Sequence, residues 1–127
     1  MSRKIRIVLR PIGELQAEIF EEKNHRTAEA VWNSLPLEGK VNRWGDEIYF
    51  EIPLKLGREN AQQIVEVGDI AYWPPGNALC IFFGPTPSSK GDEPRAYSPV
   101  NVFGKIIGDP TVLKKLRTGD LIRIERI

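Results

Sequence analysis

The side chains that could carry out nucleophilic or metal chemistry are few in this sequence. It contains one histidine, His25, and one cysteine, Cys80. A zinc site usually takes about four Cys or His ligands, and a Ser-His-Asp or Cys-His arrangement would have to use His25. Cys80 lies in an apolar segment without a basic neighbour, which is typical of an unreactive core thiol. We therefore expect no metal site, no cofactor and no nucleophilic triad.

Acidic residues form a second group that could take part in catalysis. Asp46, Glu47 and Glu51 lie close together in the sequence, and carboxylates can act as general acids or bases. Glu47 and Glu51 belong to one alternating segment, so they would lie roughly 13 Å apart along a strand. Two carboxyl groups at that distance cannot share a proton, and a glycosidase-like pair is not expected.

Aromatic residues beside prolines form the third group. Trp73 precedes the sequence Pro-Pro-Gly, which predicts a rigid bend with a raised chance of a cis bond between Trp73 and Pro74. One interpretation is a fixed turn between two strands. The other is a preformed wall of a ligand groove, in which Trp73, Tyr72 or Tyr97 would be the platforms for the ligand.

Short strands make up most of the elements that must position these groups. Apolar and polar residues alternate over 4–9 and 13–20, which predicts a first hairpin, and 37–44 with 47–52 predicts a second. Further strands are expected at 63–67, 70–73, 78–83, 100–107 and 121–127.

Two short helices complete the expected elements, one over 24–35 with an apolar stripe and one over 109–117. About eight short strands and two short helices favour a mainly β fold, a closed antiparallel β-barrel with helices at its ends. Such a barrel has no edge strands. Residues 1–127 would form a single domain. Its inner-facing side chains should include Ile48, Phe50, Ile52, Phe103, Ile122 and Ile124.

The balance of charges limits which binding partners and which cellular location are expected. The sequence has 18 basic and 17 acidic residues, for a net charge of +1. Nucleic acid and anionic membranes are therefore not expected as partners, since their binders usually carry a clustered positive excess. No apolar run reaches the ~18 residues of a membrane span, and the basic start lacks the apolar region of a signal peptide. We expect a cytoplasmic protein, and the sequence does not indicate its oligomeric state.

Two long blocks resemble a known family. Segments 41–50 (Val-Asn-Arg-Trp-Gly-Asp-Glu-Ile-Tyr-Phe) and 67–80 (Val-Gly-Asp-Ile-Ala-Tyr-Trp-Pro-Pro-Gly-Asn-Ala-Leu-Cys) resemble a small family of uncharacterised cyclophilin-like proteins from archaea and bacteria. Segment 102–107, Val-Phe-Gly-Lys-Ile-Ile, is similar to a strand of the cyclophilins that precedes a short helix. The resemblance covers nearly the whole chain and implies a cyclophilin-like barrel.

The resemblance also implies a site. Cyclophilins isomerise X-Pro bonds with an arginine that hydrogen-bonds near the proline amide, and Arg43 stands at the matching position as the candidate catalytic residue. Tyr49 follows in the same strand series, Glu51 replaces a glutamine, and Ile81 or Phe82 falls near the phenylalanine of the proline pocket. If no bulge intervenes, Arg43, Tyr49 and Glu51 share the outer face of the sheet, although the turn at Gly45-Asp46 could break this parity. The ligand-binding residues expected from the resemblance and the aromatic bend together are Arg43, Tyr49, Glu51, Trp73, Ile81, Phe82 and Tyr97.

Departures from the cyclophilin pattern reduce the expected activity. Glu51 could pair with Arg43 and occupy the donor that an isomerase needs. The histidine and tryptophan of the family are absent, with Val100 and Arg95 near their places. We therefore expect a protein that binds a peptide or small ligand beside Arg43 with weak or no prolyl isomerase activity. The alternatives are a working isomerase and an accessory subunit or enzyme acting on a small metabolite. In the simplest alternative for the residue itself, Arg43 packs its stem on a sheet and forms only a surface ion pair with Asp46 or Glu47, worth ~0–1 kcal/mol.

Overall fold

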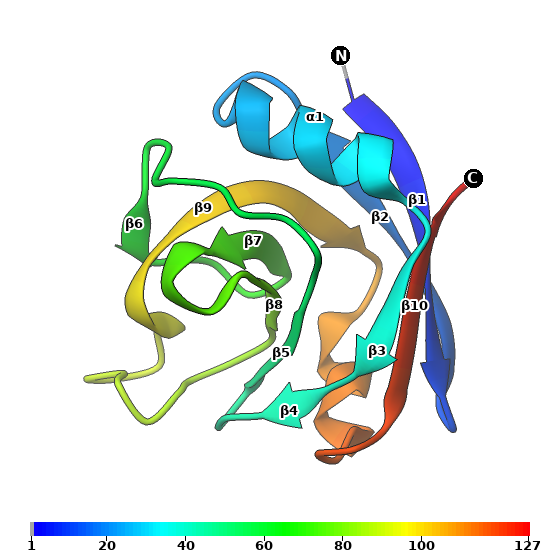
Figure 1. The fold of residues 1–127 in the computed structure, drawn as a ribbon. Helices are drawn as coiled ribbons and strands as arrows, with labels where there is room; N and C mark the ends of the chain where they lie inside the picture. The colour runs from blue at the N-terminus through cyan, green and yellow to red at the C-terminus, as the bar shows by residue number, and fades with distance from the viewer. Residues whose placement is uncertain (1) are drawn as a thin grey trace.

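Ten antiparallel strands form one curled sheet in the computed structural model of this protein, which describes residues 2–127 (Figure 1). The strands are β1 (Ser2–Arg10), β2 (Gly13–Phe20), β3 (Leu37–Lys40), β4 (Asn42–Arg43), β5 (Glu47–Glu51), β6 (Gln62–Ile64), β7 (Asp69–Trp73), β8 (Ala78–Phe82), β9 (Arg95–Ile107) and β10 (Leu121–Arg126). Neighbouring strands follow the order β3-β10-β1-β2-β9-β7-β8-β5-β4, and β6 pairs with β9 outside this path. The predicted mainly β, antiparallel fold is confirmed, and β1 and β2 form the predicted first hairpin.

The two ends of this sheet do not pair, so the closed barrel of the prediction is an open, curled sheet. β3 and β4 stand at opposite ends of the strand order, yet only Val41 separates them in the chain. The Val41 N–H donates to the Asp120 carbonyl at 2.9 Å, and its own carbonyl accepts from the Gly119 N–H at 2.8 Å. Phe50 fills the seam, since a Cβ on Gly39 would lie 3.0 Å from its ring. The chain and this ring thus close the core where strand pairing does not.

Helical segments cover the two ends of the curled sheet. α1 (His25–Ser34) lies over the upper end in Figure 1 and buries Ala28 and Val31 in the core. At the lower end, the second predicted helix is a shorter 3-10 helix, η2 (Pro110–Lys115). It ends before Leu116, which has an extended backbone conformation, and the carbonyls of Lys114 and Leu116 accept hydrogen bonds from Arg43. A further 3-10 turn, η1 (Pro74–Gly76), connects β7 to β8.

Two apolar clusters lie on opposite faces of the sheet. The larger cluster fills the inside and contains all six side chains predicted to face inward, each at most 3% exposed. A smaller outer cluster lies on β7, β8, the first half of β9 and the residue after β6, and it comprises Val65, Ala71, Cys80, Phe82, Ala96 and Val100. β8 is therefore buried along its whole length, which explains why segment 78–83 is apolar on both faces. The outer cluster is what gives this side of the sheet a pocket.

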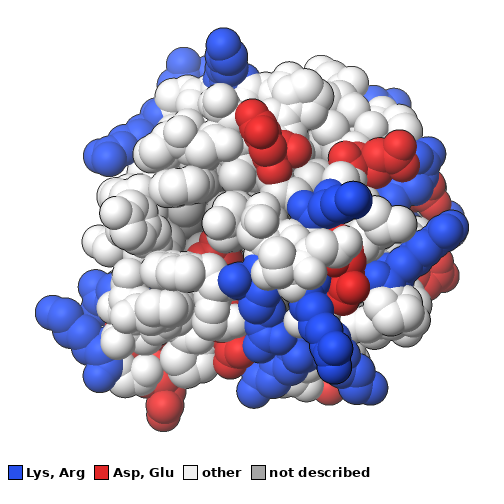
Figure 2. Space-filling model, turned by 60° about the horizontal axis from the view of Figure 1, so that its bottom comes forward, with Lys and Arg blue, Asp and Glu red and all other residues white. Residues whose placement is uncertain are grey.

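Charges of both signs are mixed over the surface. On the face shown in Figure 2, Lys and Arg side chains lie beside Asp and Glu side chains, and a broad area carries neither. Within residues 2–127, no helix is long and apolar enough to cross a membrane.

Candidate ligand-binding site

A cavity of about 160 Å³ opens on the outer face of the sheet, where β5, β7 and the start of β9 meet. Its lining consists of four aromatic side chains, two small apolar ones and one carboxylate: Trp44, Tyr49, Trp73, Tyr97, Ala96, Val100 and Glu47. These residues come from separate stretches of the chain, so the pocket exists only in the folded protein.

The aromatic side chains of the pocket form a continuous series of edge-to-face contacts. Tyr97 lies between Trp44 and Trp73, with ring centroids 6.1 Å apart in both pairs and interplanar angles of 75° and 87°. Trp73 also contacts Tyr49, at 6.4 Å and 67°. Perpendicular rings at these distances attract one another through their quadrupoles. The walls of the cavity are therefore held in place by one another.

The bend after β7 fixes the orientation of Trp73. Its indole N–H donates to the Ser98 hydroxyl at 2.6 Å. Its ring lies so close to Gly76 that a Cβ on that residue would overlap it. The cis bonds of residues 2–127 are Arg10–Pro11 and Leu35–Pro36, so the bond between Trp73 and Pro74, which had a raised chance of being cis, is trans. The bend nevertheless places Trp73 as a wall of the cavity.

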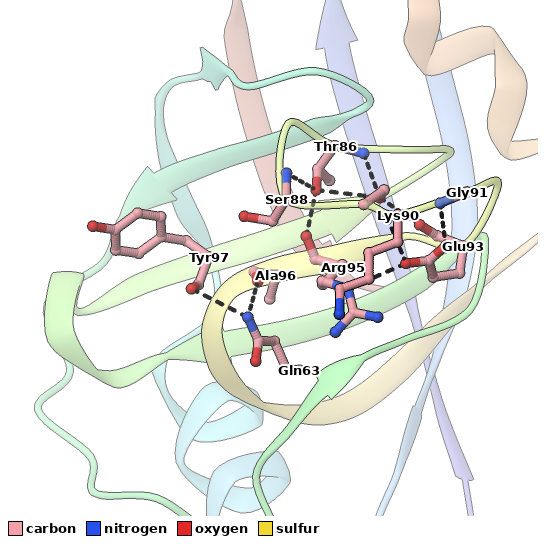
Figure 3. Close-up of polar contacts among 10 residues, drawn as sticks. Gln63, Thr86, Ser88, Lys90, Gly91, Glu93, Arg95, Ala96 and Tyr97 are labelled. Atoms are coloured by element: carbon pink, nitrogen blue, oxygen red, sulfur yellow. Dashed lines mark hydrogen bonds and ion pairs between the residues drawn. The ribbon is translucent and has the colours of Figure 1, made fainter.

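A network of polar contacts holds the segment that carries Tyr97 (Figure 3). The Gln63 side-chain amide donates to the carbonyls of Ala96 and Tyr97 at 3.0 and 3.4 Å. Before this segment, the Glu93 carboxylate accepts from the backbone N–H groups of Lys90 and Gly91 at 2.9 and 2.8 Å. In Figure 3 the Tyr97 ring points away from these contacts. Gln63 therefore holds the backbone of Ala96 and Tyr97, and Tyr97 is 70% exposed at the rim of the cavity.

Glu47 is the charged group of the cavity lining. It lies opposite Phe82 in the β5–β8 ladder and is only 6% exposed. Burial raises the pKa of the Glu47 carboxyl to about 7, and a hydrogen bond with the Cys80 thiol opposes this rise. Burial and the neighbouring Glu47 also raise the pKa of Cys80 well above its ordinary value, which agrees with an unreactive thiol. Near neutral pH, Glu47 can therefore be either protonated or charged.

Arg43 lies on the other face of the sheet from this cavity. In the β4–β5 ladder it is opposite Ile48, whereas Tyr49 is opposite Asn42. Directly opposed residues in an antiparallel pair share a face, so Arg43 faces the inner side together with the core residue Ile48. The prediction that Arg43, Tyr49 and Glu51 share the outer face is therefore wrong. The turn at Gly45-Asp46 reverses the parity between β4 and β5.

The Arg43 guanidinium is occupied by hydrogen bonds within the protein. Its Nη1 donates to the carbonyls of Lys114 and Leu116 at 2.7 and 2.9 Å, and its Nε donates to the Gly45 carbonyl at 2.7 Å. Its Nη2 pairs with Asp46 at 2.9 Å, so Asp46 rather than Glu51 is its acidic partner. The Phe83 ring lies against the guanidinium, with its centroid 5.1 Å from the Arg43 Cζ atom. Arg43 thus ties the β4–β5 turn to η2.

The structure gathers three of the seven predicted site residues, Tyr49, Trp73 and Tyr97, in the cavity. Ile81 lies in the inner core and Phe82 in the outer cluster, both fully buried. Glu51 ends β5 in an exposed position, and Arg43 binds η2.

Sequence reasoning did not assign Trp44 and Glu47 to the cavity. Glu47 alternates with Tyr49 in the same strand, and this shared parity was the available signal. Trp44 lies beyond the turn at Gly45, where parity no longer applies. Among residues 2–127, no group of three or more His, Cys, Asp or Glu side chains could hold a metal ion.

A family model described as cyclophilin-like matches residues 3–125, and the chain belongs to this family. Among solved structures, it is similar to the solution structure of the hypothetical protein AF2241 from Archaeoglobus fulgidus. The two share 39% sequence identity with a TM-score of 0.83, over 99% of this chain and 95% of the other. No curated protein matches the sequence.

Proposed function

We propose that this protein is a ligand-binding member of the cyclophilin-like family with weak or no prolyl isomerase activity, and that its ligand occupies the aromatic cavity. One observation carries the proposal: four aromatic side chains surround a cavity that contains a buried carboxylate. Binding sites are commonly apolar, largely preformed hollows with a few placed polar groups. The cavity has this composition, and its volume of about 160 Å³ is large enough for part of a small molecule or one side chain of a peptide.

Two features support a loss of isomerase activity. Each nitrogen of the Arg43 guanidinium already donates to an acceptor of the protein itself. A prolyl isomerase needs such a donor free for the substrate, and freeing it here would cost the contacts that hold η2. In addition, Tyr49, rather than Arg43, faces the cavity.

A fragment screen by NMR tests the binding proposal. Neutral, anionic and cationic fragments would be added to ¹⁵N-labelled protein while the three indole N–H signals are followed. Binding fragments should shift the signals of Trp44 and Trp73. Trp32 is the internal control, since it lies on α1 between Arg3 and Arg126 and not in the cavity. The proposal fails if no fragment shifts the two cavity signals, or if all hits act elsewhere.

A standard assay with Ala-Pro and Phe-Pro peptides tests the second half of the proposal. The protein should be far slower than an ordinary cyclophilin. A rate equal to that of an ordinary cyclophilin would contradict this and make the protein a working isomerase.

A further inference from the structure

We infer that the cavity is an aromatic cage for a methylated ammonium group, with the rings of Trp44, Tyr49, Trp73 and Tyr97 around the cation and Glu47 beside it. The inference rests on the proposed function, because it names the ligand class of the same cavity. A free small molecule and a methylated lysine side chain both carry this chemical group.

The arrangement of the rings is the first reason. Neighbouring rings of the series are inclined by 67° to 87° to one another, so the lining of the cavity offers aromatic surface in more than one orientation. Aromatic faces attract cations within about 6 Å, and cages of this kind are known to recognise quaternary ammonium groups. Methyl groups on the nitrogen also bury apolar surface against the rings, which a bare ammonium does not.

The charge of the lining is the second reason. Of the described residues, Glu47 is the only charged one that lines the cavity. Among residues 2–127, no Lys, Arg or His forms an ion pair with it, and its hydrogen-bond partner is the Cys80 thiol. A buried carboxylate without a cationic partner is costly. A cationic ligand supplies the missing partner, whereas an anionic ligand would add a second negative charge.

The size and exposure of the cavity are the third reason. It measures about 160 Å³, whereas sites for drug-sized ligands span ~300–1,000 Å³. An apolar cavity of ~150 Å³ accommodates a molecule the size of benzene, which is comparable with a trimethylammonium group. Tyr97 is 70% exposed at the rim, so the remainder of the ligand can extend into solvent.

The ionisation of Glu47 makes binding depend on pH. Burial raises the pKa of Glu47 to about 7, and a bound cation favours the charged form and lowers this pKa. Cys80 on β8, Tyr49 on β5 and Tyr97 on β9 are the other titratable groups around it, and burial keeps the Cys80 thiol protonated by raising its pKa. Choline carries a fixed charge, so its affinity should rise roughly tenfold between pH 6 and pH 8, as Glu47 loses its proton.

A comparison of choline with 3,3-dimethylbutan-1-ol tests the inference. The two molecules have the same shape, but the alcohol carries carbon in place of the charged nitrogen. Titrated at pH 8 and followed by the Trp44 and Trp73 indole signals, choline should bind at least about tenfold more tightly. Equal or tighter binding of the alcohol would overturn the ligand class while the cavity remains a binding site. If neither compound nor any fragment shifts these signals, the proposed function itself fails.

Two matched variants test how much Glu47 contributes to the preference for choline over the alcohol. Glu47→Gln keeps the size of the side chain and should reduce the preference for choline, leaving only the part due to the aromatic rings, and it should remove the pH dependence. Glu38→Gln, an exposed carboxylate on β3 paired with Arg123, is the control and should keep both. A preference and a pH dependence that are both unchanged in Glu47→Gln would contradict the inference.

A short peptide containing trimethyllysine separates the two sources of the group. If the peptide binds more tightly than choline, the ligand is a methylated side chain of another protein. If it binds more weakly, the ligand is a free small molecule. Equal affinity of the peptide and its unmethylated form would contradict a role for the methyl groups.

Discussion

The two charged residues that flank the β4–β5 turn, Arg43 and Glu47, differ in whether other groups of the protein pair with their charge. Arg43 faces the inner side of the sheet, and each of its guanidinium nitrogens has an acceptor within the chain. Glu47 faces the outer side in a cavity, buried and without an ionic partner among the described residues. Hydrogen bonds between a charged group and acceptors of the same protein are strong. A buried charge without such partners destabilises the fold unless a ligand of opposite charge pairs with it. The comparison therefore assigns a structural role to the residue singled out by the family resemblance and a binding role to its neighbour.

The largest effect is expected from the inner face itself. Phe50→Ala should lower the free energy of unfolding by ~3–5 kcal/mol, because it empties the seam between β3 and β5. Urea denaturation measures this loss. Tyr49→Ala, one position earlier but on the outer face, is the matched variant and should cost much less. A loss below ~1 kcal/mol for Phe50→Ala would show that the ring is not part of the core.

Glu47 should make the stability of the protein depend on pH. Its pKa is about 7 in the folded protein, against an ordinary value of 4.5 for a glutamate side chain, so the folded state holds the proton more tightly than the unfolded state. The free energy of unfolding should therefore fall as pH rises from about 4.5 to about 7, by up to ~3 kcal/mol. Urea melts of the wild type and Glu47→Gln across this range measure the difference. Identical pH profiles would mean that Glu47 titrates normally.

Arg43→Ala should cost about 2 kcal/mol of stability, because several hydrogen bonds from a charged donor are lost together. Arg26→Ala is the control, since that side chain is 83% exposed and its ion pair with Glu59 spans 3.8 Å. Exposed pairs of this kind contribute ~0–1 kcal/mol. Choline affinity should change far less in Arg43→Ala than in Glu47→Gln, and the opposite ranking would reverse the comparison between the two residues.

A fall in binding with a modest loss of stability is expected from Gly76→Ala. The added methyl group would overlap the Trp73 ring and turn it out of the cavity wall. Choline affinity should fall severalfold, and the melting temperature should fall as well, because Trp73 loses its contacts with Tyr97 and Ser98. Gly57→Ala adds the same group where nothing lies within 4 Å, and it should leave binding unchanged. Equal affinities in the two variants would show that the position of Trp73 does not matter for the ligand.

Alternation along single strands predicted the inner face well, because burial on one side imposes a period of two. Ile122 and Ile124, like Phe50, lie where the pattern placed them. The predictions that failed concerned how separate segments of the chain lie relative to one another. The parity of Arg43 could not be carried across the turn at Gly45, since a turn resets the alternation.

The cavity was only partly predictable for the same reason. Trp73 and Tyr97 were expected to serve as platforms, but which side chains meet them depends on how β9 curls over β7. Closure of the sheet was likewise not encoded in any one strand. β3 and β4 are separated by Val41 alone, so they follow one another along the chain and cannot pair with each other, and the Phe50 ring packs against Gly39 at this point.

The titration of the Glu47 carboxyl carbon by ¹³C NMR, with and without saturating choline, tests the account most directly. In the free protein we expect a pKa of about 7 because of burial. Choline should lower this pKa, because the cation stabilises the carboxylate. An ordinary pKa in the free protein, or a raised pKa that choline leaves unchanged, would contradict the claim that Glu47 is an unpaired charge awaiting a cationic ligand.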